Sequence, residues 1–364
     1  MKLAPPPHCE LLLRGLREPH ALRHLGPAEW ELLIRVARRA RLHGVLHARL
    51  AGDGALHLVP DRVLTHLESG AAVARYRLQM VKLEQHHLAR ALGDAGVPLV
   101  LLKGAAYAAQ NLPCAQGRPL NDLDIMTPAA HLPRVEAAMR REGWRSAVED
   151  PYDERYYREW SHEVPPLRGD GRMLEVDLHH TILPPTGRLR PDADRLFADA
   201  VRLPGSPFSV LAPADQVLHA AVHLLQDADI AERLRDVVDL DGLVRAHAEW
   251  PRFWTELIQH AEHHGLQRPL WYALRLAQCW LGTPIDAAAL AGLSAHAPGT
   301  AIGALMHALL GATLLPAHPD RGRTPWRIAS SQLLRMRAMW QRMPPGLLAR
   351  HATAKMARAM SSAR

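Results

Sequence analysis

The sequence has few of the residues that disulfide frameworks, zinc sites and membrane spans require. Three cysteines (Cys9, Cys114 and Cys279) lie far apart among 364 residues and are odd in number, which excludes a disulfide framework and a cysteine-based zinc site. The longest apolar run, residues 305–317, contains His307 and is shorter than the roughly 18 residues of a membrane span. The N-terminus lacks the apolar core of a signal peptide. We therefore expect a cytoplasmic protein without a transmembrane segment.

Aromatic residues are scarce throughout, and acidic residues are absent from the C-terminal part. Aromatic residues make up 5% of the chain, so the core must consist mainly of Leu, Ala and Val. Residues 321–364 contain nine Arg, one Lys and no Asp or Glu, so the first 320 residues carry a net charge of about −3 although the whole chain carries +7. An amphipathic helix is predicted within this basic tail. It indicates either contact with nucleic acid or an anionic membrane surface, or a cap on the helical domain with solvated Arg side chains.

The hydrophobic pattern divides the chain into parts of different periodicity. Residues 1–96 show helical spacing, with long amphipathic stretches at 29–50 and 61–92. Residues 97–210 alternate short apolar runs with helical stretches, and residues 211–350 are helical again. The last part, 351–364, is basic and is expected to fray. The sequence thus predicts an α+β protein whose mixed-sheet core is flanked by helical segments.

Within residues 97–210, strands and helices can be placed individually. We expect strands at 97–102, 120–126, 144–148 and 172–182, helices at 105–112 and 128–143, and an irregular excursion at 150–170. Thr127 is the predicted N-cap of the second helix.

Three motifs in this part point to phosphate and metal chemistry. Lys103-Gly104 stands at a strand-to-helix turn, where a glycine allows a phosphate to approach backbone amides and the positive end of a helix. Asp122 and Asp124 are two residues apart on a predicted strand, so both side chains point to one face. Asp177 lies on a later strand. Clustered carboxylates repel one another unless a cation lies between them, and Mg²⁺ prefers oxygen ligands.

These motifs, LLKGAAYA, RPLNDLDIMT and EVDLHH, together resemble the bacterial family of uncharacterised nucleotidyltransferases, a branch of the polymerase-β-like superfamily. The resemblance covers about residues 98–180. It implies a polymerase-β-like core in which Asp122, Asp124 and Asp177 are catalytic and hold Mg²⁺, or Mn²⁺ in its place. It also places Lys103, Gly104, Ala105 and Arg118 at the nucleotide. Where the superfamily usually has Gly-Ser or Gly-Gly at the turn, this chain has Gly104-Ala105 and lacks the serine hydroxyl.

Other residues have both functional and structural interpretations. Glu175 and His179 lie on the face of Asp177 and could orient the acceptor or accept its proton, or could be satisfied structurally at the strand edge. His219 and His223 have the spacing of a helical metal pair but lack a nearby third ligand. Arg233 or Asp236 could reach the cleft from a second domain, or could belong to a solvated helix face.

The sequence therefore predicts transfer of a nucleoside monophosphate from a nucleoside triphosphate to an unknown acceptor hydroxyl or phosphate. The resemblance further implies a link to polysaccharide biosynthesis. Two alternatives stay open at this point. The same core could modify RNA, as toxin-like nucleotidyltransferases do, or it could be a degenerate scaffold in which Ala105 marks a lost triphosphate site.

Overall fold

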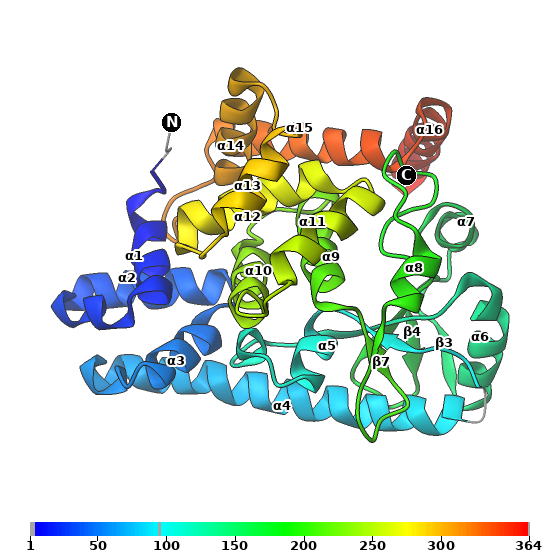
Figure 1. Ribbon diagram of the computed structural model, residues 1–364, viewed down its shortest axis with the longest axis horizontal. Helices are drawn as coiled ribbons and strands as arrows, with labels where there is room; N and C mark the ends of the chain where they lie inside the picture. Colours follow the sequence, from blue (N-terminus) through cyan, green and yellow to red (C-terminus); the bar gives the residue numbers. More distant parts are fainter. Residues whose placement is uncertain (1–3, 94–95, 363–364) are drawn as a thin grey trace.

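The computed structural model describes residues 4–93 and 96–362, with side chains through residue 356. It confirms an α+β fold with one mixed sheet (Figure 1). Helical segments precede and follow the strand-containing part of the chain. The long helix α4 runs along the bottom of the view, the sheet lies above its right half, and the C-terminal helices form the upper part.

The N-terminal segment is helical, as predicted. One expected helical stretch, 29–50, is divided into two helices, because Arg41 has a left-handed backbone with φ of 56° that a continuous helix does not allow. The second expected stretch is a single helix of 32 residues. The helices of this segment are α1 (Pro7–Arg17), α2 (Pro27–Arg39), α3 (His43–Gly52) and α4 (Asp61–Leu92).

The sheet has seven strands in the order β3-β4-β5-β2-β1-β7-β6. Its centre is β2, which pairs in parallel with β5 and antiparallel with β1. Strand β1 in turn pairs in parallel with β7. The strands are β1 (Val100–Leu101), β2 (Asp122–Met126), β3 (Trp144–Ser146), β4 (Leu167–Gly169), β5 (Glu175–His179), β6 (Val201–Arg202) and β7 (Ser209–Val210).

Between the strands, the structure agrees with several expected elements and corrects others. The expected excursion at 150–170 contains helix α7 (Pro151–Trp160) and strand β4. Thr127 does not cap a helix: its hydroxyl is buried without a partner among the described residues, and α6 begins at Leu132 after a short 3₁₀ turn. The remaining elements are α5 (Lys103–Ala109), the 3₁₀ turn η4 (Pro113–Ala115), α6 (Leu132–Arg141) and α8 (Ala193–Ala198).

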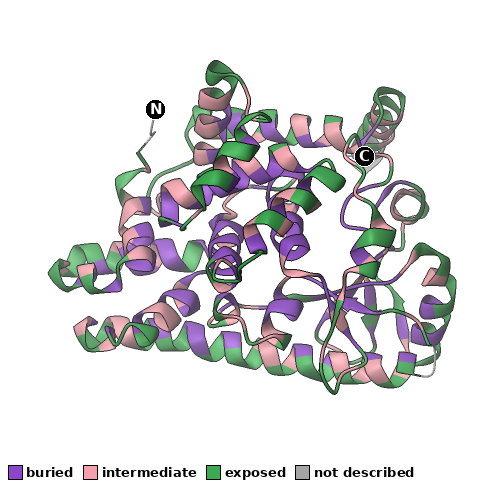
Figure 2. Ribbon diagram, viewed as in Figure 1, coloured by how far each residue is buried: buried purple, intermediate pink, exposed green. Residues whose placement is uncertain are grey.

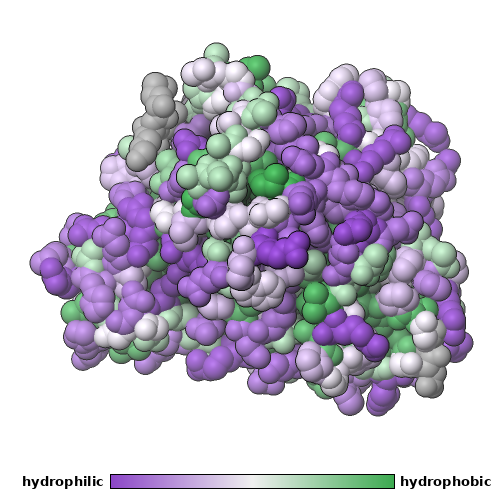
Figure 3. All heavy atoms as spheres, viewed as in Figure 1, coloured by the Kyte–Doolittle hydropathy of each residue, from purple (hydrophilic) through white to green (hydrophobic). Residues whose placement is uncertain are grey.

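The chain is helical from residue 213 onward, as expected. Within the described residues, none of the helices combines the length and the apolar character that crossing a membrane requires. The face shown in Figure 3 is mainly hydrophilic, with hydrophobic residues in scattered groups. The C-terminal helices are α9 (Pro213–Gln226), α10 (Leu234–His247), α11 (Phe253–His263), α12 (Gln267–Leu281), α13 (Ala287–Ser294), α14 (Thr300–Leu314), α15 (Pro325–Arg342) and α16 (Pro345–Ser362).

Helix α4 joins the N-terminal segment to the sheet. Its Glu84 is buried and accepts a hydrogen bond of 2.8 Å from the indole nitrogen of Trp144 on β3. Arg172 stacks over the Trp144 ring at 3.8 Å and pairs with the same Glu84. Figure 2 shows α4 buried on the side toward the other elements and exposed on the opposite side. Helix α4 therefore packs against the sheet and is joined to it by the buried Glu84.

Candidate active site

The register of two central strands brings the three aspartates together. Strands β2 and β5 are parallel neighbours, with Asp124 opposite Asp177 and Asp122 opposite Glu175. Opposed residues of paired strands project from the same face of a sheet. Leu123, between the two aspartates of β2, is fully buried on the other face. The sequence therefore folds so that four carboxylates of two strands share one face.

Asp124 is the most enclosed of these carboxylates. Its Oδ1 lies 2.6 Å from Nζ of Lys103 and 3.1 Å from Nε2 of His179. Burial works to raise the pKa of Asp124, but Lys103 and His179 outweigh it and hold that pKa well below its ordinary value. Burial also opposes the charge on Lys103, yet Asp124, then Asp122, raise the pKa of its amine. This pair is therefore ionised.

The other two aspartates titrate in the opposite direction. Burial, followed by the charges of Asp124 and Glu163, raises the pKa of Asp177 to about 8. The pKa of Asp122 is also raised, because the protein around this otherwise exposed side chain reduces its hydration and Asp124 lies beside it. Such opposed shifts among neighbouring carboxylates are typical of a crowded functional centre. They show that this face favours an additional positive charge.

Glu163 belongs to this acidic centre but was not predicted. It lies just before β4 in an isolated bridge with His179, and its Oε2 is 3.4 Å from Nε2 of that ring. His162, Glu163 and His179 offer ligand atoms within 4.8 Å of one another. No periodic pattern marks residues 161–166, so only the fold reveals the proximity.

Glu175 and His179 occupy different surroundings. His179 is fully buried, and its Nε2 faces both Asp124 and Glu163. Glu175 is partly exposed at the edge of the face and pairs with Arg168 at 2.5 Å. The predicted role of either residue at the acceptor stays a prediction.

The Lys103-Gly104-Ala105 turn lies directly beside the aspartates. Lys103 has a left-handed φ of 47°, an uncommon conformation for a residue with a side chain, and it turns the chain from β1 into α5. A Cβ added to Gly104 would lie 2.2 Å from Nη1 of Arg118. Gly104 therefore leaves space for a guanidinium over the turn, and Ala105 is buried beneath it.

Arg118 is held at this position by an ion pair with a helix that is distant in the sequence. Its Nε lies 2.9 and 3.0 Å from the two carboxylate oxygens of Asp239 on α10, and both residues are buried. The guanidinium also lies over the Tyr107 ring at 5.9 Å. Within the described part of the chain, its Nη groups have no hydrogen-bond partner, so they stay available at the turn.

A cleft lies between the turn, the aspartates and helices α9 and α10. The core contributes Lys103, Tyr107, Arg118, Asp122 and Asp124, and the helices contribute residues of 220–239. The sequence had placed Arg233 or Asp236 at the cleft as one of two interpretations, and both line it. Asp239 and Arg235 were not selected, because their helical spacing equally fits a solvated face. The helix residues of the lining are Ala220, His223, Arg233, Arg235, Asp236 and Asp239.

A second group of potential ligands lies elsewhere, on α9 and α11. Asp215, His260 and His264 place ligand atoms within 4.8 Å of one another. However, Nδ1 of His264 accepts a hydrogen bond from the backbone of Asp192, so the proton of the neutral ring is on Nε2, which faces Asp215 at 3.5 Å. Nδ1 of His260 lies 2.8 Å from the same oxygen. This group is a buried carboxylate whose Oδ1 bonds to His260, while its Oδ2 has no hydrogen-bond partner among the described residues.

The pair His219 and His223 lies near the aspartates but is not arranged as a metal site. Burial lowers the pKa of His223 to about 4, and burial also lowers the pKa of His219 well below its ordinary value. His223 faces Asp236 at 3.7 Å. Both rings are therefore neutral; His223 lines the cleft, whereas His219 is buried.

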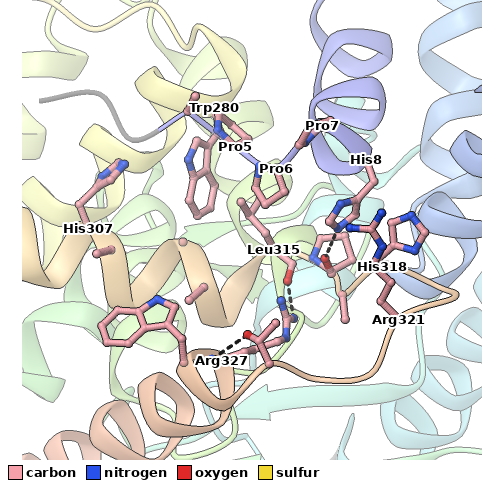
Figure 4. A pocket seen from close by; sticks show the side chains of 18 of the residues that line it. Pro5, Pro6, Pro7, His8, Trp280, His307, Leu315, His318, Arg321 and Arg327 are labelled. Atoms are coloured by element: carbon pink, nitrogen blue, oxygen red, sulfur yellow. Dashed lines mark hydrogen bonds between the residues drawn. The ribbon is translucent and has the colours of Figure 1, made fainter.

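A large hollow of about 410 Å³ lies away from the aspartates, near the N-terminus (Figure 4). The proline run Pro5–Pro7 forms one side, and Trp280, His307 and Leu315 form another. Arg327 donates to the Leu315 carbonyl there and is not directed at a free space. The lining is mainly apolar and lacks carboxylates, so it does not share the chemistry of the acidic face.

The chemistry of the acidic face suits a divalent cation, although Asp122, Asp124 and Asp177 are not among the groups of described residues whose ligand atoms all lie within 4.8 Å of one another. Its donors are carboxylate oxygens, the ligands that Mg²⁺ prefers, and they lie on two paired strands whose register fixes their spacing. The amine of Lys103 against Asp124 shows that a positive charge is accommodated there. Asp122, Asp124 and Asp177 would hold the ion, with Glu163 beside them.

Comparison with known proteins identifies one family. The model of a family described as uncharacterised nucleotidyltransferase matches residues 26–282, which includes the acidic face, the Lys103 turn and helices α9 to α12. No curated protein and no solved structure matches the chain. Because the matched residues make up more than half of the chain, the protein is a member of this family of nucleotidyltransferase enzymes.

Proposed function

We propose that this enzyme is a metal-dependent transferase that moves a nucleoside monophosphate from a nucleoside triphosphate to an acceptor hydroxyl or phosphate. Family membership implies the triphosphate substrate. The observation that carries the proposal is the parallel register of β2 and β5, which sets Asp124 opposite Asp177 and Asp122 beside them. Four acidic side chains on one face, next to a cleft with four cationic side chains, suit a polyphosphate–metal complex.

In this proposal Asp122, Asp124 and Asp177 are the catalytic, metal-holding residues. Mg²⁺, or Mn²⁺ in its place, would neutralise the charge that develops on the phosphates. His179 keeps Asp124 oriented through the 3.1 Å contact, and Lys103 balances its charge. These residues position the reacting groups and neutralise the phosphate charge, which is the main contribution of proteins to phosphoryl transfer.

The reaction would form one bond and break one. An acceptor oxygen bonds to the α-phosphorus, the bond between that phosphorus and the α,β-bridging oxygen breaks, and pyrophosphate leaves. The acceptor proton needs a base nearby. The partly exposed Glu175, opposite Asp122 on the same face, is the proposed base, and His179 beside Asp124 is the alternative.

Lys103, Gly104, Ala105 and Arg118 are the proposed contacts of the nucleotide. Gly104 admits the guanidinium of Arg118 over the turn, and the free Nη groups of Arg118 can donate to phosphate oxygens. This arrangement places a side-chain donor near the position where a serine hydroxyl is missing at Ala105. It favours an active enzyme over a degenerate scaffold.

The acceptor is proposed only by class. A role in polysaccharide assembly rests on the resemblance of the motifs and makes a sugar hydroxyl or sugar phosphate the acceptor of choice. A cytoplasmic location is part of the same proposal, because nucleoside triphosphates are available there.

The basic C-terminal part is the proposed contact with an anionic membrane surface. On α15, Leu333, Met336 and Trp340 share one helix face and are 45%, 60% and 48% exposed. The opposite face packs on the protein through Ser330, Leu334 and Ala338. Residues 321–364 carry ten cationic side chains and no acidic one. An exposed apolar stripe with cationic neighbours is typical of a helix at a lipid surface, whereas base stacking on nucleic acid needs aromatic rings, and two of the three residues of this stripe are not aromatic.

A thermal-shift panel tests the transferase proposal. The melting temperature is measured with ATP, GTP, CTP and UTP, each with and without Mg²⁺, for the native chain, Asp122→Asn and Asp124→Asn. A ligand that binds only the folded state raises the melting temperature. We expect a shift for at least one nucleotide that requires Mg²⁺ and is lost in both variants. Absence of a shift for every nucleotide would instead favour the scaffold alternative.

A further inference from the structure

The candidate cleft contains four cationic side chains, and their partners differ. Lys103 is paired with Asp124 at 2.6 Å. Arg233 is paired with Asp227, and its Nε lies 2.9 Å from Asp236. Arg118 uses only its Nε, toward Asp239. Three of the four are therefore paired directly with a carboxylate, although Arg118 leaves its Nη groups free of such a pair, and only Arg235 has no ion pair shorter than 3.4 Å.

Arg235 is largely buried but poorly satisfied. Its side chain is 17% exposed, and its nearest ionic contact is Asp236, at 3.4 Å from Nη2. Its Nε is buried and, in the described part of the chain, has no hydrogen-bond partner. A buried donor without a partner costs about 1–3 kcal/mol, so such a group is expected to have a ligand in the working protein.

The position of Arg235 joins two hollows. It lines the cleft beside the aspartates, and it also lines a second, polar hollow with Arg39, Arg41 and several acidic residues of 227–236. Arg41 is exposed and lines this second hollow, whereas the neighbouring Arg39 is paired with Glu232. The charge of Arg235 also acts on the pKa of Asp122, which places it within electrostatic reach of the acidic face.

Arg235 and Asp239 are carried by the same helix, one turn apart on α10. Helix α10 therefore positions two guanidinium groups at the cleft. It carries Arg235 itself, and it holds Arg118 through the hydrogen bonds to Asp239. Two guanidinium groups with free N–H donors are suited to phosphate oxygens, which they bind with directed, charge-assisted hydrogen bonds.

We propose that Arg235 binds the β- and γ-phosphates of the substrate, and hence the departing pyrophosphate, together with Arg118. This inference rests on the proposed function and assigns α10 a role in the reaction. Arg235 is not needed to neutralise Asp236, because Asp236 is already paired with Arg233 at a shorter distance.

Calorimetric titration tests this assignment. The ligands are a triphosphate with a methylene group in place of the α,β-bridging oxygen, inorganic pyrophosphate and the matching nucleoside monophosphate, each with Mg²⁺. The proteins are the native chain, Arg235→Gln, Arg235→Lys and the control Arg252→Gln, whose side chain is 82% exposed on α11's N-terminal side. The melting temperature of each variant without ligand verifies that it is folded.

We expect Arg235→Gln to weaken the binding of the triphosphate analogue and of pyrophosphate by about tenfold to a hundredfold, the range for charge-assisted hydrogen bonds. Monophosphate binding should change less than about threefold, Arg235→Lys should lie between, and Arg252→Gln should match the native chain. Equal affinities of Arg235→Gln and the native chain would overturn the assignment, as would an equal loss for all three ligands. A native chain that binds neither triphosphate analogue nor pyrophosphate would overturn the proposed function as well.

Discussion

At the scale of single residues, Asp124 is the point on which the acidic face depends. One carboxylate oxygen contacts both a lysine amine and a histidine ring, and the carboxylate itself is 3% exposed. Asp122 and Asp177 surround it with like charge and themselves have raised pKa values. Lys103 therefore has two effects, since it stabilises the fold and holds a positive charge where a divalent ion would also be attracted.

Substitution of Lys103 should separate these effects. Lys103→Met leaves Asp124 charged and enclosed without its main partner, so we expect the free energy of unfolding to fall by about 3 kcal/mol in metal-free buffer, as when one member of a buried ion pair is removed. Excess Mg²⁺ should recover part of this loss by binding the same carboxylates. Urea unfolding with and without Mg²⁺ measures both quantities, and Lys82→Met on the exposed part of α4 is the control.

A loss of the same size with and without Mg²⁺ would contradict a metal at this face. Unchanged stability of Lys103→Met would instead mean that the Lys103–Asp124 pair contributes no net stabilisation.

The residue scale also shows what the sequence could reveal. The sequence predicts Asp122, Asp124 and Asp177 as site residues because alternation on strands is a strong local pattern, and the parallel register of β2 and β5 sets them on one face. Glu163 and Arg235 were not predicted, because their roles depend on packing between segments that are distant in the chain. A single carboxylate in a proline-rich loop, or an arginine on a charged helix, has no local pattern that distinguishes function from solvation.

At the scale of elements, the segment 113–119 is held by an unusually close contact with the N-terminal helices. Gly117 has φ of +70°, and a Cβ there would lie 2.0 Å from the backbone oxygen of Gly44 on α3. Gly44 in turn lies against Gly70 of α4. The contact fixes the chain immediately before Arg118, so the N-terminal helices help to place a residue of the cleft.

Gly117→Ala should therefore destabilise the protein through both strain and overlap. We expect a loss of about 3 kcal/mol in the free energy of unfolding, because the new methyl group meets a backbone atom that cannot rotate away. Gly54→Ala is the matched control: Gly54 has φ of +67° but no atom within 4 Å of an added Cβ, so it should show only the cost of left-handed strain, about 1 kcal/mol.

Denaturant unfolding of both variants compares the two contributions. If Gly117→Ala and Gly54→Ala cost the same, the close approach of Gly44 and Gly117 does not contribute.

Elements with strong periodicity were predicted well, and short or irregular ones were not. Helix α4 follows the expected 61–92 pattern to its end. The strand expected at 97–102 has only Val100 and Leu101 in the ladder, because its length is set by its neighbours β2 and β7. Strands β6 and β7 and helix α7 lie in polar or proline-rich sequence and were missed, since tertiary pairing decides whether such short segments form.

At the scale of the whole molecule, the predicted segments interlock. The expected boundaries near residues 96 and 210 stay predictions, but buried contacts cross both of them: Trp144 to Glu84 across the first, and Arg118 to Asp239 across the second. The family match likewise spans parts of all three segments. The cleft is therefore built jointly, because both the sheet and α10 contribute carboxylates to its lining and α10 also contributes Arg235.

The C-terminal helices α13 to α16 lie beyond the matched residues, and their surface differs from the rest. Of the strongly exposed large hydrophobic residues, Ile302, Leu305, Trp326, Ile328, Leu333, Met336, Trp340 and Met356 lie in this part. Arg337 donates to the Leu225 carbonyl and so fastens α15 onto α9, which leaves its apolar stripe facing outward. This part is thus attached firmly to the enzyme while presenting a basic and apolar surface.

We therefore expect the protein to co-sediment with vesicles that contain phosphatidylglycerol, and much less with vesicles of phosphatidylcholine alone, because anionic lipid attracts the cationic side chains and the bilayer interface accepts the apolar stripe. The double variant Leu333→Gln/Met336→Gln should weaken this binding by about tenfold or more, since two apolar side chains no longer enter the interface. Leu83→Gln, at a residue that is 49% exposed on α4, should bind like the native chain. Salt should reduce the affinity of every variant. Salt-sensitive binding to RNA without vesicle binding would instead favour the RNA-modifying alternative, and binding to neither would leave α15 as a cap on the helical part.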